Sequence, residues 1–185
     1  MKQQKLLQLL EKFEHYYLFD QQKDLQNPIL RKSLVFFTEL GSSFVIIGFL
    51  AILAIIEDTK IAIILIPIYL FQLSIIELIK ITFKRKRPHT FRKENILRIN
   101  FDTGSFPSGH TSNIFSLAFL LSNFYETNII ITSILFLIAA TVAASRLFLG
   151  KHYFIDVFAG GILGVLLTYL GSIIWIMVLT YLQIP

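Results

Sequence analysis

A histidine and a carboxylate in the second half of the chain have a spacing that suits catalysis. His152 and Asp156 are four residues apart, so on a helix they share one face. There the carboxylate can accept a hydrogen bond from one ring nitrogen and leave the other nitrogen as a nucleophile or base. Ser145 and Arg146 stand just before this pair. Metal ligation is the rival use, but we find no third or fourth ligand at a convincing spacing.

The tetrapeptide Pro107, Ser108, Gly109 and His110 opens an apolar stretch. Serine is a favoured N-cap, and a helix N-terminus presents unpaired N–H groups and positive potential to an anion. Glycine lets a ligand approach the backbone closely. We therefore expect His110 to lie beside a bound anion. For the tetrapeptide alone, an interfacial histidine without a role stays open as the alternative.

A third cluster is cationic. Lys80 precedes Arg87 by seven residues, which is nearly two helical turns, so both side chains can project from one face. Pro88 disfavours helix at the residue before it and marks the end of the helix. Two cations at a helix terminus suit a phosphate. Taken alone, the segment could equally be a basic stretch that flanks a membrane span.

The elements that position these residues are apolar. The chain has 185 residues, of which 55% are hydrophobic and 16% charged, and this apolar surplus exceeds what a soluble domain of this size needs. A spanning helix takes about 20 mainly apolar residues. We predict an all-α, polytopic membrane bundle with about five transmembrane helices, over roughly 34–56, 61–83, 108–125, 128–149 and 153–185.

The last of these stretches is too long for one perpendicular helix and too short for two, so we expect one long, tilted or kinked helix. Its glycines, Gly160, Gly161, Gly164 and Gly171, allow close packing or a bend. In the second stretch the polar side chains of Gln72 and Ser74 should face the bundle interior.

Residues 1–26 carry leucines and aromatic residues at helical spacing, with most charges on other faces. This pattern predicts an amphipathic helix that lies on the membrane surface or packs on the protein itself. It does not resemble a cleaved signal peptide. We treat 1–185 as a single domain, with the helical bundle in 34–185.

The long connection between the second and third stretches is rich in lysine and arginine. Long loops in compact domains are usually functional. Its His89 is either a further phosphate contact or an exposed loop residue, and we favour the latter. Counting chain reversals, the three polar clusters emerge on the same membrane face.

Together, in this order, the clusters resemble the type 2 phosphatidic acid phosphatase family. The family signature is K-x6-R-P, then P-S-G-H, then S-R-x5-H-x3-D, and the chain reads KITFKRKRP, PSGH and SRLFLGKHYFID without a mismatch. The resemblance spans residues 80 to 156. Members commonly have six spans, whereas we count five and an amphipathic N-terminal helix.

The resemblance implies that His152 attacks phosphorus to form a phosphohistidine intermediate. Asp156 would hold the imidazole in the productive tautomer, and His110 would protonate the departing oxygen. The family works without a metal ion, so we expect no metal or other cofactor. The groups that would bind the phosphoryl oxygens are Lys80, Arg87, Ser108, the backbone N–H of Gly109, and Arg146.

The resemblance fixes the reaction more closely than the lipid. We expect a hydrolase of a phosphate monoester or diphosphate at headgroup level. Undecaprenyl diphosphate ranks first as substrate, lipid A 1-phosphate second, and phosphatidylglycerophosphate and phosphatidic acid remain alternatives. The expected partners are the bilayer and the phosphorylated lipid, with no obligate protein partner.

Other classes explain the sequence less well. A nucleic-acid binder would carry a broad basic face rather than clusters between apolar spans. A membrane transporter would explain the spans but not the convergence of histidines, a carboxylate and cations. A vanadium-dependent haloperoxidase shares the anion-binding residues, but such enzymes are soluble and much larger.

Charge and resemblance conflict over orientation. Of the 17 lysines and arginines, we place all but Lys60 on the face of the predicted site. The positive-inside rule would then put the site in the cytoplasm. The resemblance implies a bacterial inner membrane protein whose site faces the periplasm or exterior. We favour this second orientation because several of the cations are needed to bind phosphate.

Overall fold

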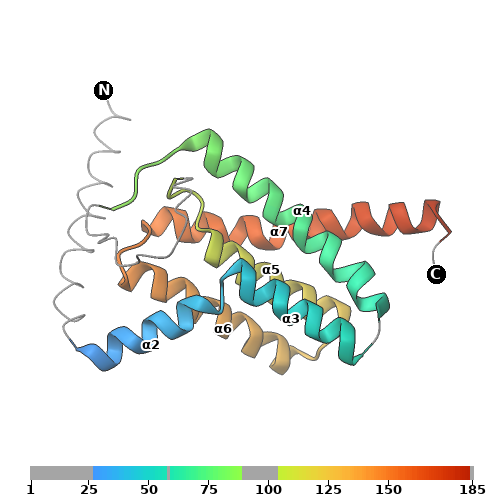
Figure 1. Cartoon of the computed structure of the whole chain (residues 1–185), viewed down its shortest axis with the longest axis horizontal. Helices are drawn as coiled ribbons and strands as arrows, with labels where there is room; N and C mark the ends of the chain where they lie inside the picture. Colours follow the sequence, from blue (N-terminus) through green and yellow to red (C-terminus); the bar gives the residue numbers. More distant parts are fainter. Residues whose placement is uncertain (1–26, 58, 89–103, 184–185) are drawn as a thin grey trace.

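The fold is a bundle of helices in the computed structural model, which describes residues 27–57, 59–88 and 104–183. Its helices are α2 (Pro28–Glu39), α3 (Ser43–Ile56), α4 (Thr59–Phe83), α5 (Gly109–Phe124), α6 (Ile129–Phe148) and α7 (Phe154–Tyr181) (Figure 1). No strand occurs in these ranges, and the predicted all-α class is confirmed. The predicted amphipathic helix in 1–26, and His89 in the long loop, lie outside the described residues.

The first predicted span is broken. The structure has two helices, α2 and α3, that meet at an angle of 55° and together are long and apolar enough for one bent span. At the break, a Cβ atom on Gly41 would lie 2.6 Å from the carbonyl oxygen of His110, so α5 packs directly on the bend. Asn113 of α5 donates to the Gly41 carbonyl at 3.2 Å. The side-chain amide of Asn113 thus provides a hydrogen bond to a carbonyl group that has no partner within a helix at the break.

Within the described residues, three single helices are long and apolar enough to cross a membrane: Ala62–Phe83 within α4, α6, and α7. The bent pair adds a fourth candidate span. Helix α5, the third predicted span, has 16 residues. At 1.5 Å per residue it is about 24 Å long, shorter than a hydrocarbon core of about 30 Å. As predicted, 154–181 is one long helix, and it extends past the others towards the C-terminus (Figure 1).

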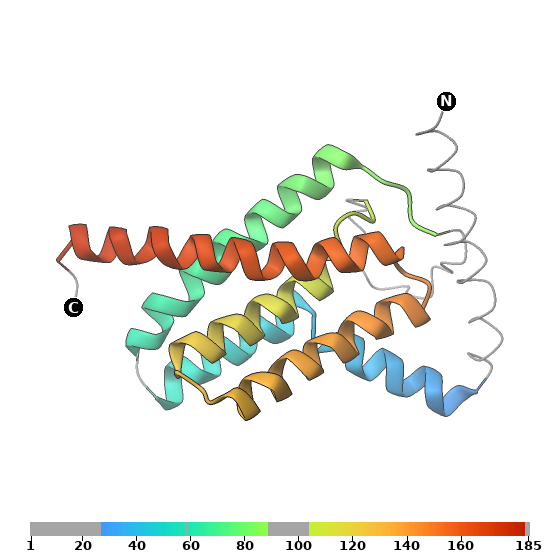
Figure 2. The same ribbon diagram turned by 180° about the vertical axis from the view of Figure 1, so that it is seen from behind.

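Helix α5 is the centre of the bundle, because α3, α4, α6 and α7 all pack against it (Figure 2). Polar residues are therefore buried along its length and pair with the surrounding helices. Gln72 donates to Ser112, and Ser116 shares a hydrogen bond with Thr168. Such pairs are needed where water is absent. Ser74 departs from the prediction: it is exposed and donates to the Leu70 carbonyl of its own helix.

Two glycines of α7 set its distance from α5. A Cβ atom on Gly160 would lie 2.7 Å from the Ser108 carbonyl oxygen, and one on Gly164 would overlap the Ser112 carbonyl. The two backbones therefore touch, which is the close packing that the glycines predicted. This contact fixes the start of α7 against the start of α5.

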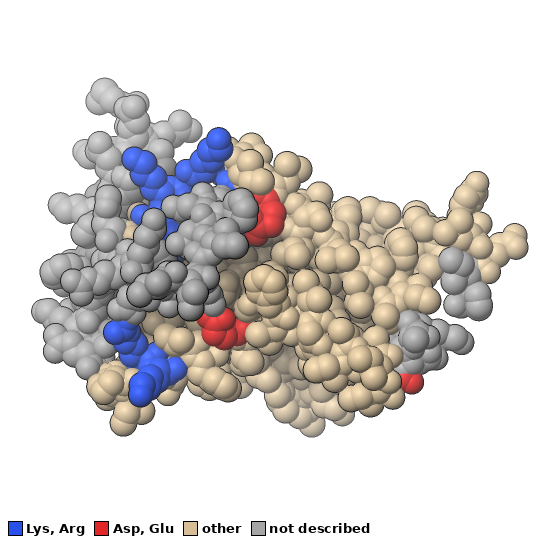
Figure 3. Space-filling view, viewed as in Figure 1, with Lys and Arg blue, Asp and Glu red and all other residues tan. Residues whose placement is uncertain are grey.

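The ends of α4 and α6 and the starts of α5 and α7 gather at one end of the bundle (Figures 1 and 2). The lysines and arginines visible in Figure 3 lie at this end, whereas the rest of that face is almost free of charge. The predicted convergence of the three polar clusters is therefore observed in the fold.

Candidate active site

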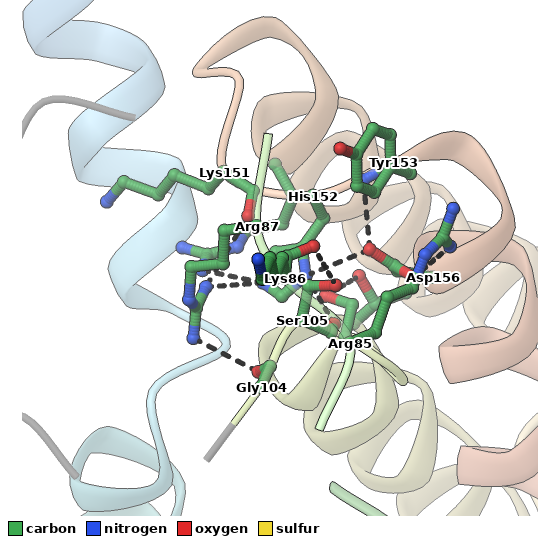
Figure 4. A network of polar contacts seen from close by, with 12 residues as sticks. Arg85, Lys86, Arg87, Gly104, Ser105, Lys151, His152, Tyr153 and Asp156 are labelled. Atoms are coloured by element: carbon green, nitrogen blue, oxygen red, sulfur yellow. Dashed lines mark hydrogen bonds and ion pairs between the residues drawn. The ribbon is translucent and has the colours of Figure 1, made fainter. Parts of the chain in front are cut away.

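His152 is buried in the short connection between α6 and α7. Its Nδ1 lies 2.8 Å from the carbonyl oxygen of Ser105. Its Nε2 lies 3.1 Å from a guanidinium nitrogen of Arg146 and 3.4 Å from one of Arg87. A guanidinium only donates, so Nε2 must offer its lone pair, and Nδ1 must carry the proton that the carbonyl accepts. The surroundings thus select a neutral imidazole whose Nε2 lone pair faces two arginines (Figure 4).

The protonation of His152 follows from its surroundings. Burial lowers the pKa of His152 to about 3, and the charges of Arg146 and Arg87 act in the same direction, against the opposing effect of Asp156. The imidazole is therefore neutral throughout the physiological range. A buried neutral histidine with an available lone pair is suited to nucleophilic attack.

Asp156 is fully buried and has three partners. Its Oδ1 lies 2.6 Å from Arg85, and its Oδ2 accepts from the Tyr153 N–H at 3.0 Å. The same Oδ2 is 3.8 Å from Nδ1 of His152. The direct acceptor of the imidazole proton is thus the Ser105 carbonyl, with the predicted carboxylate just beyond hydrogen-bond distance.

This difference has a geometric cause. Helix α7 begins at Phe154, so His152 lies outside it and the i, i+4 relation does not apply. Asp156 is instead the third residue of the helix. There its carboxylate accepts a hydrogen bond from the Tyr153 N–H and interacts favourably with the positive end of the helix dipole.

The two arginines beside Nε2 are held by separate elements. Arg146, near the end of α6, is buried and donates to the Thr38 hydroxyl of α2 at 3.0 Å. Arg87, beyond α4, reaches the carbonyl oxygens of Lys151 and Gly104, each at 3.4 Å. Their convergence creates a site for an anion in front of Nε2, because each guanidinium can bind two oxygens of a phosphate.

Lys80, in the last turn of α4, extends its ammonium to the start of α5. A Cβ atom on Gly109 would collide with the Lys80 ammonium, so this glycine permits the approach. Lys80 also forms an ion pair with Glu77, three residues earlier on α4. The ammonium and the first N–H groups of α5 thus add positive potential to the same end of the bundle.

Ser108 and His110 flank this glycine. Ser108 donates from its backbone N–H to the Asp156 carbonyl at 2.9 Å, and its hydroxyl pairs with Thr111. The buried Nε2 of His110 has no hydrogen-bond partner among the described residues. His152 and Arg146 lie close enough to act electrostatically on this ring. All eight predicted site residues therefore occupy one end of the bundle.

Sequence reasoning missed three contributors: Thr38, Arg85 and Ser105. Arg85 is hidden in a run of basic residues, and Thr38 lies far from the motifs. Ser105 acts through its carbonyl oxygen, which no side-chain pattern indicates. Its place just before the Pro107 motif is the one signal that could have suggested it.

The amino-acid sequence of residues 61–180 matches the model of the PAP2 superfamily. Among curated proteins, the chain is 31% identical over 121 residues to a probable lipid phosphate phosphatase beta of Arabidopsis thaliana, and the match covers 52% of this chain and 57% of that protein. It is also 46% identical over 63 residues to the bacitracin transport permease protein BcrC of Bacillus licheniformis, covering 34% and 29%. The chain thus spans little more than half, or less, of these relatives.

Two crystal structures share its architecture. LpxE of Aquifex aeolicus superposes with a TM-score of 0.64 at 29% identity, covering 80% of this chain and 88% of that one. A PAP2-type phosphatidylglycerophosphate phosphatase of Bacillus subtilis superposes with a TM-score of 0.70 at 22% identity, covering 89% and 85%. At that identity the second likeness shows the fold alone.

Proposed function

Because the chain belongs to the PAP2 superfamily, we propose that it is an integral-membrane lipid phosphatase that uses His152 as a covalent nucleophile. One observation carries this proposal. The Nε2 lone pair of a neutral, buried His152 faces the guanidinium groups of Arg87 and Arg146. A phosphoryl group bound by these arginines would present its phosphorus to Nε2.

In the first step Nε2 of His152 attacks phosphorus, and the bond from phosphorus to the lipid oxygen breaks. Arg87, Arg146, Lys80 and the N-terminus of α5 bind the non-bridging oxygens, whose charge they stabilise in the transition state. His110 takes up a proton when the negatively charged phosphate binds beside it, and it gives this proton to the departing oxygen. The Ser105 carbonyl and Asp156 face Nδ1 and stabilise the positive ring of the phosphohistidine.

In the second step a water molecule attacks the phosphohistidine. His110, now neutral, accepts a proton from this water, and the bond between phosphorus and Nε2 breaks. Inorganic phosphate leaves, and His152 returns to the neutral form with its Nε2 lone pair restored. The sum is hydrolysis of one phosphate ester or anhydride bond by one water molecule.

The site's place at one end of an apolar bundle suits a substrate that is anchored in the bilayer and has its phosphate at headgroup level. Undecaprenyl diphosphate is the first candidate, as expected from the sequence. Lipid A 1-phosphate and phosphatidylglycerophosphate are the alternatives. The curated relative named a probable lipid phosphate phosphatase supports a lipid phosphate as the substrate class. We place the protein in a bacterial inner membrane with its site facing the periplasm or exterior.

The test is release of phosphate in detergent micelles containing EDTA, with each candidate lipid offered to the wild type and to His152→Ala. We expect release by the wild type alone, and the relative rates identify the preferred lipid. With a substrate labelled on phosphorus, the wild type should carry acid-labile label that the variant lacks. Equal release by both proteins, or none from any lipid, would contradict the proposal.

A further inference from the structure

Arg85 binds Asp156 from the side opposite His152. Its guanidinium lies 2.6 Å from Oδ1, while Oδ2 faces the imidazole at 3.8 Å. The same guanidinium stacks over the Tyr153 ring, 4.3 Å from the centroid. Tyr153 immediately precedes α7 and donates its N–H to Asp156, so ring, carboxylate and guanidinium form one unit (Figure 4).

The backbone of Arg85 reaches the other acceptor of His152. Its carbonyl oxygen accepts the N–H of Ser105 at 2.7 Å, and the Ser105 hydroxyl donates to the next carbonyl, that of Lys86, at 3.1 Å. Ser105 is therefore fastened to the segment after α4, with its own carbonyl turned to Nδ1 of His152. Both groups that face Nδ1 thus depend on residue 85.

A carboxylate shared between two cationic partners binds each less strongly than it would bind one alone. The guanidinium of Arg85 is permanently charged, and it competes with any positive charge that develops on the imidazole. While Arg85 is in place, Asp156 therefore favours the imidazolium only weakly, and Nδ1 keeps the Ser105 carbonyl as its direct acceptor. Without Arg85, Oδ2 would turn its full charge on His152.

We propose that Arg85 is a positioning residue for His152: by sharing the Asp156 carboxylate, its guanidinium keeps Nδ1 of the imidazole on the Ser105 carbonyl and so fixes the orientation of the ring. The catalytic meaning of this role rests on the proposed phosphatase function. The pairing itself is independent of that function, and the two can fail separately.

The test follows the titration of the His152 ring by ¹⁵N NMR in detergent, with its signals assigned by their loss in His152→Ala. In Arg85→Gln we expect His152 to titrate about one pH unit higher than in the wild type. The other charged or titratable groups that act on this ring are His110 from α5, Arg146 from α6 and Arg87 from the segment after α4. The variants leave all of them unchanged.

Two further variants separate the pairing from a general loss of charge. Lys86 is the residue after Arg85, and its side chain is exposed. Lys86→Gln also removes one positive charge, but it should move the titration of His152 by less than half as much as Arg85→Gln. In the double variant Arg85→Gln with Asp156→Asn the rise should disappear, because the carboxylate that causes it is gone. A rise of equal size in the double variant, or in Lys86→Gln, would overturn the proposal.

Kinetics in micelles connect the pairing to the reaction. We expect Arg85→Gln to lower kcat about tenfold at pH 6 with KM nearly unchanged. The ring is neutral at this pH in both proteins, so the loss comes from the freed carboxylate, which draws the Nδ1 proton away from the Ser105 carbonyl and turns Nε2 from the bound phosphoryl group. Arg85→Lys should recover part of the loss. A rise in KM with constant kcat would instead make Arg85 a substrate contact and contradict the inference. A wild type that releases no phosphate, yet shows the titration shift, would remove the proposed function and leave the pairing intact.

Discussion

At the scale of single residues, the tautomer of His152 is set by its hydrogen-bond partners. One ring nitrogen faces groups that can only donate, and the other faces a group that can only accept. Arg146 and Arg87 face Nε2, and the Ser105 carbonyl faces Nδ1. The tautomer therefore depends on where the arginines are held. Arg146 is held by Thr38, a buried residue of α2 outside every motif.

We predict that Thr38→Val lowers kcat/KM for a lipid phosphate about tenfold, because a hydrogen bond to a charged group contributes about 1.5 kcal/mol. Valine keeps the shape and branching of threonine, so the bundle should fold. Thr141→Val is the matched control: this hydroxyl is exposed on α6 and bonds only to the Leu137 carbonyl of its own helix. Rates in micelles measure both variants, and equal losses would refute a specific role for Thr38.

The residue types of the site could be predicted from the sequence, because each belongs to a short motif with its own chemistry. The contact between His152 and Asp156 could not, since it depends on whether α7 begins before or after the histidine. The roles of Thr38 and Ser105 could not be predicted either, because their partners are far away in sequence. These roles arise only when α2 and the loop before α5 pack on the site.

At the scale of elements, the catalytic geometry depends on how closely α7 approaches α5. Gly160 and Gly164 let the two backbones touch, and the Ser108 N–H then bonds to the Asp156 carbonyl. The sequence predicted close packing from these glycines. It did not predict the break between α2 and α3, because the need for Gly41 comes from the His110 carbonyl that packs on it.

We predict that Gly164→Ala destabilises the protein by about 1 to 3 kcal/mol, since the new methyl group overlaps the Ser112 carbonyl and must push the helices apart. Activity should fall further than stability, because the same shift separates the two halves of the site. Gly48→Ala in α3 is the control: nothing lies within 4 Å of its new Cβ atom, and alanine favours helix by up to about 1 kcal/mol. In thermal unfolding measured in detergent, we therefore expect a lower melting temperature for Gly164→Ala but not for Gly48→Ala.

At the scale of the whole molecule, lysines and arginines gather at one end of the bundle and the remainder is almost free of charge, which Figure 3 shows for one face. Of the described cations near the site, Arg87 and Arg146 have side-chain partners within it. Cations that a site requires carry little information on topology, because their position is set by the reaction. The positive-inside rule therefore does not contradict the orientation that we propose.

The chain has no cysteine, so single cysteines can report which end of the bundle faces outwards. Lys86 is exposed beside the site, and Asn123 is exposed near the far end of α5. In intact cells, a membrane-impermeant thiol reagent should label Lys86→Cys at once and Asn123→Cys only after the membrane is permeabilised. The reverse pattern would place the site in the cytoplasm, where it could act only on lipid phosphates of the inner leaflet. A lipid phosphate that is confined to the outer leaflet would then be out of reach of the site.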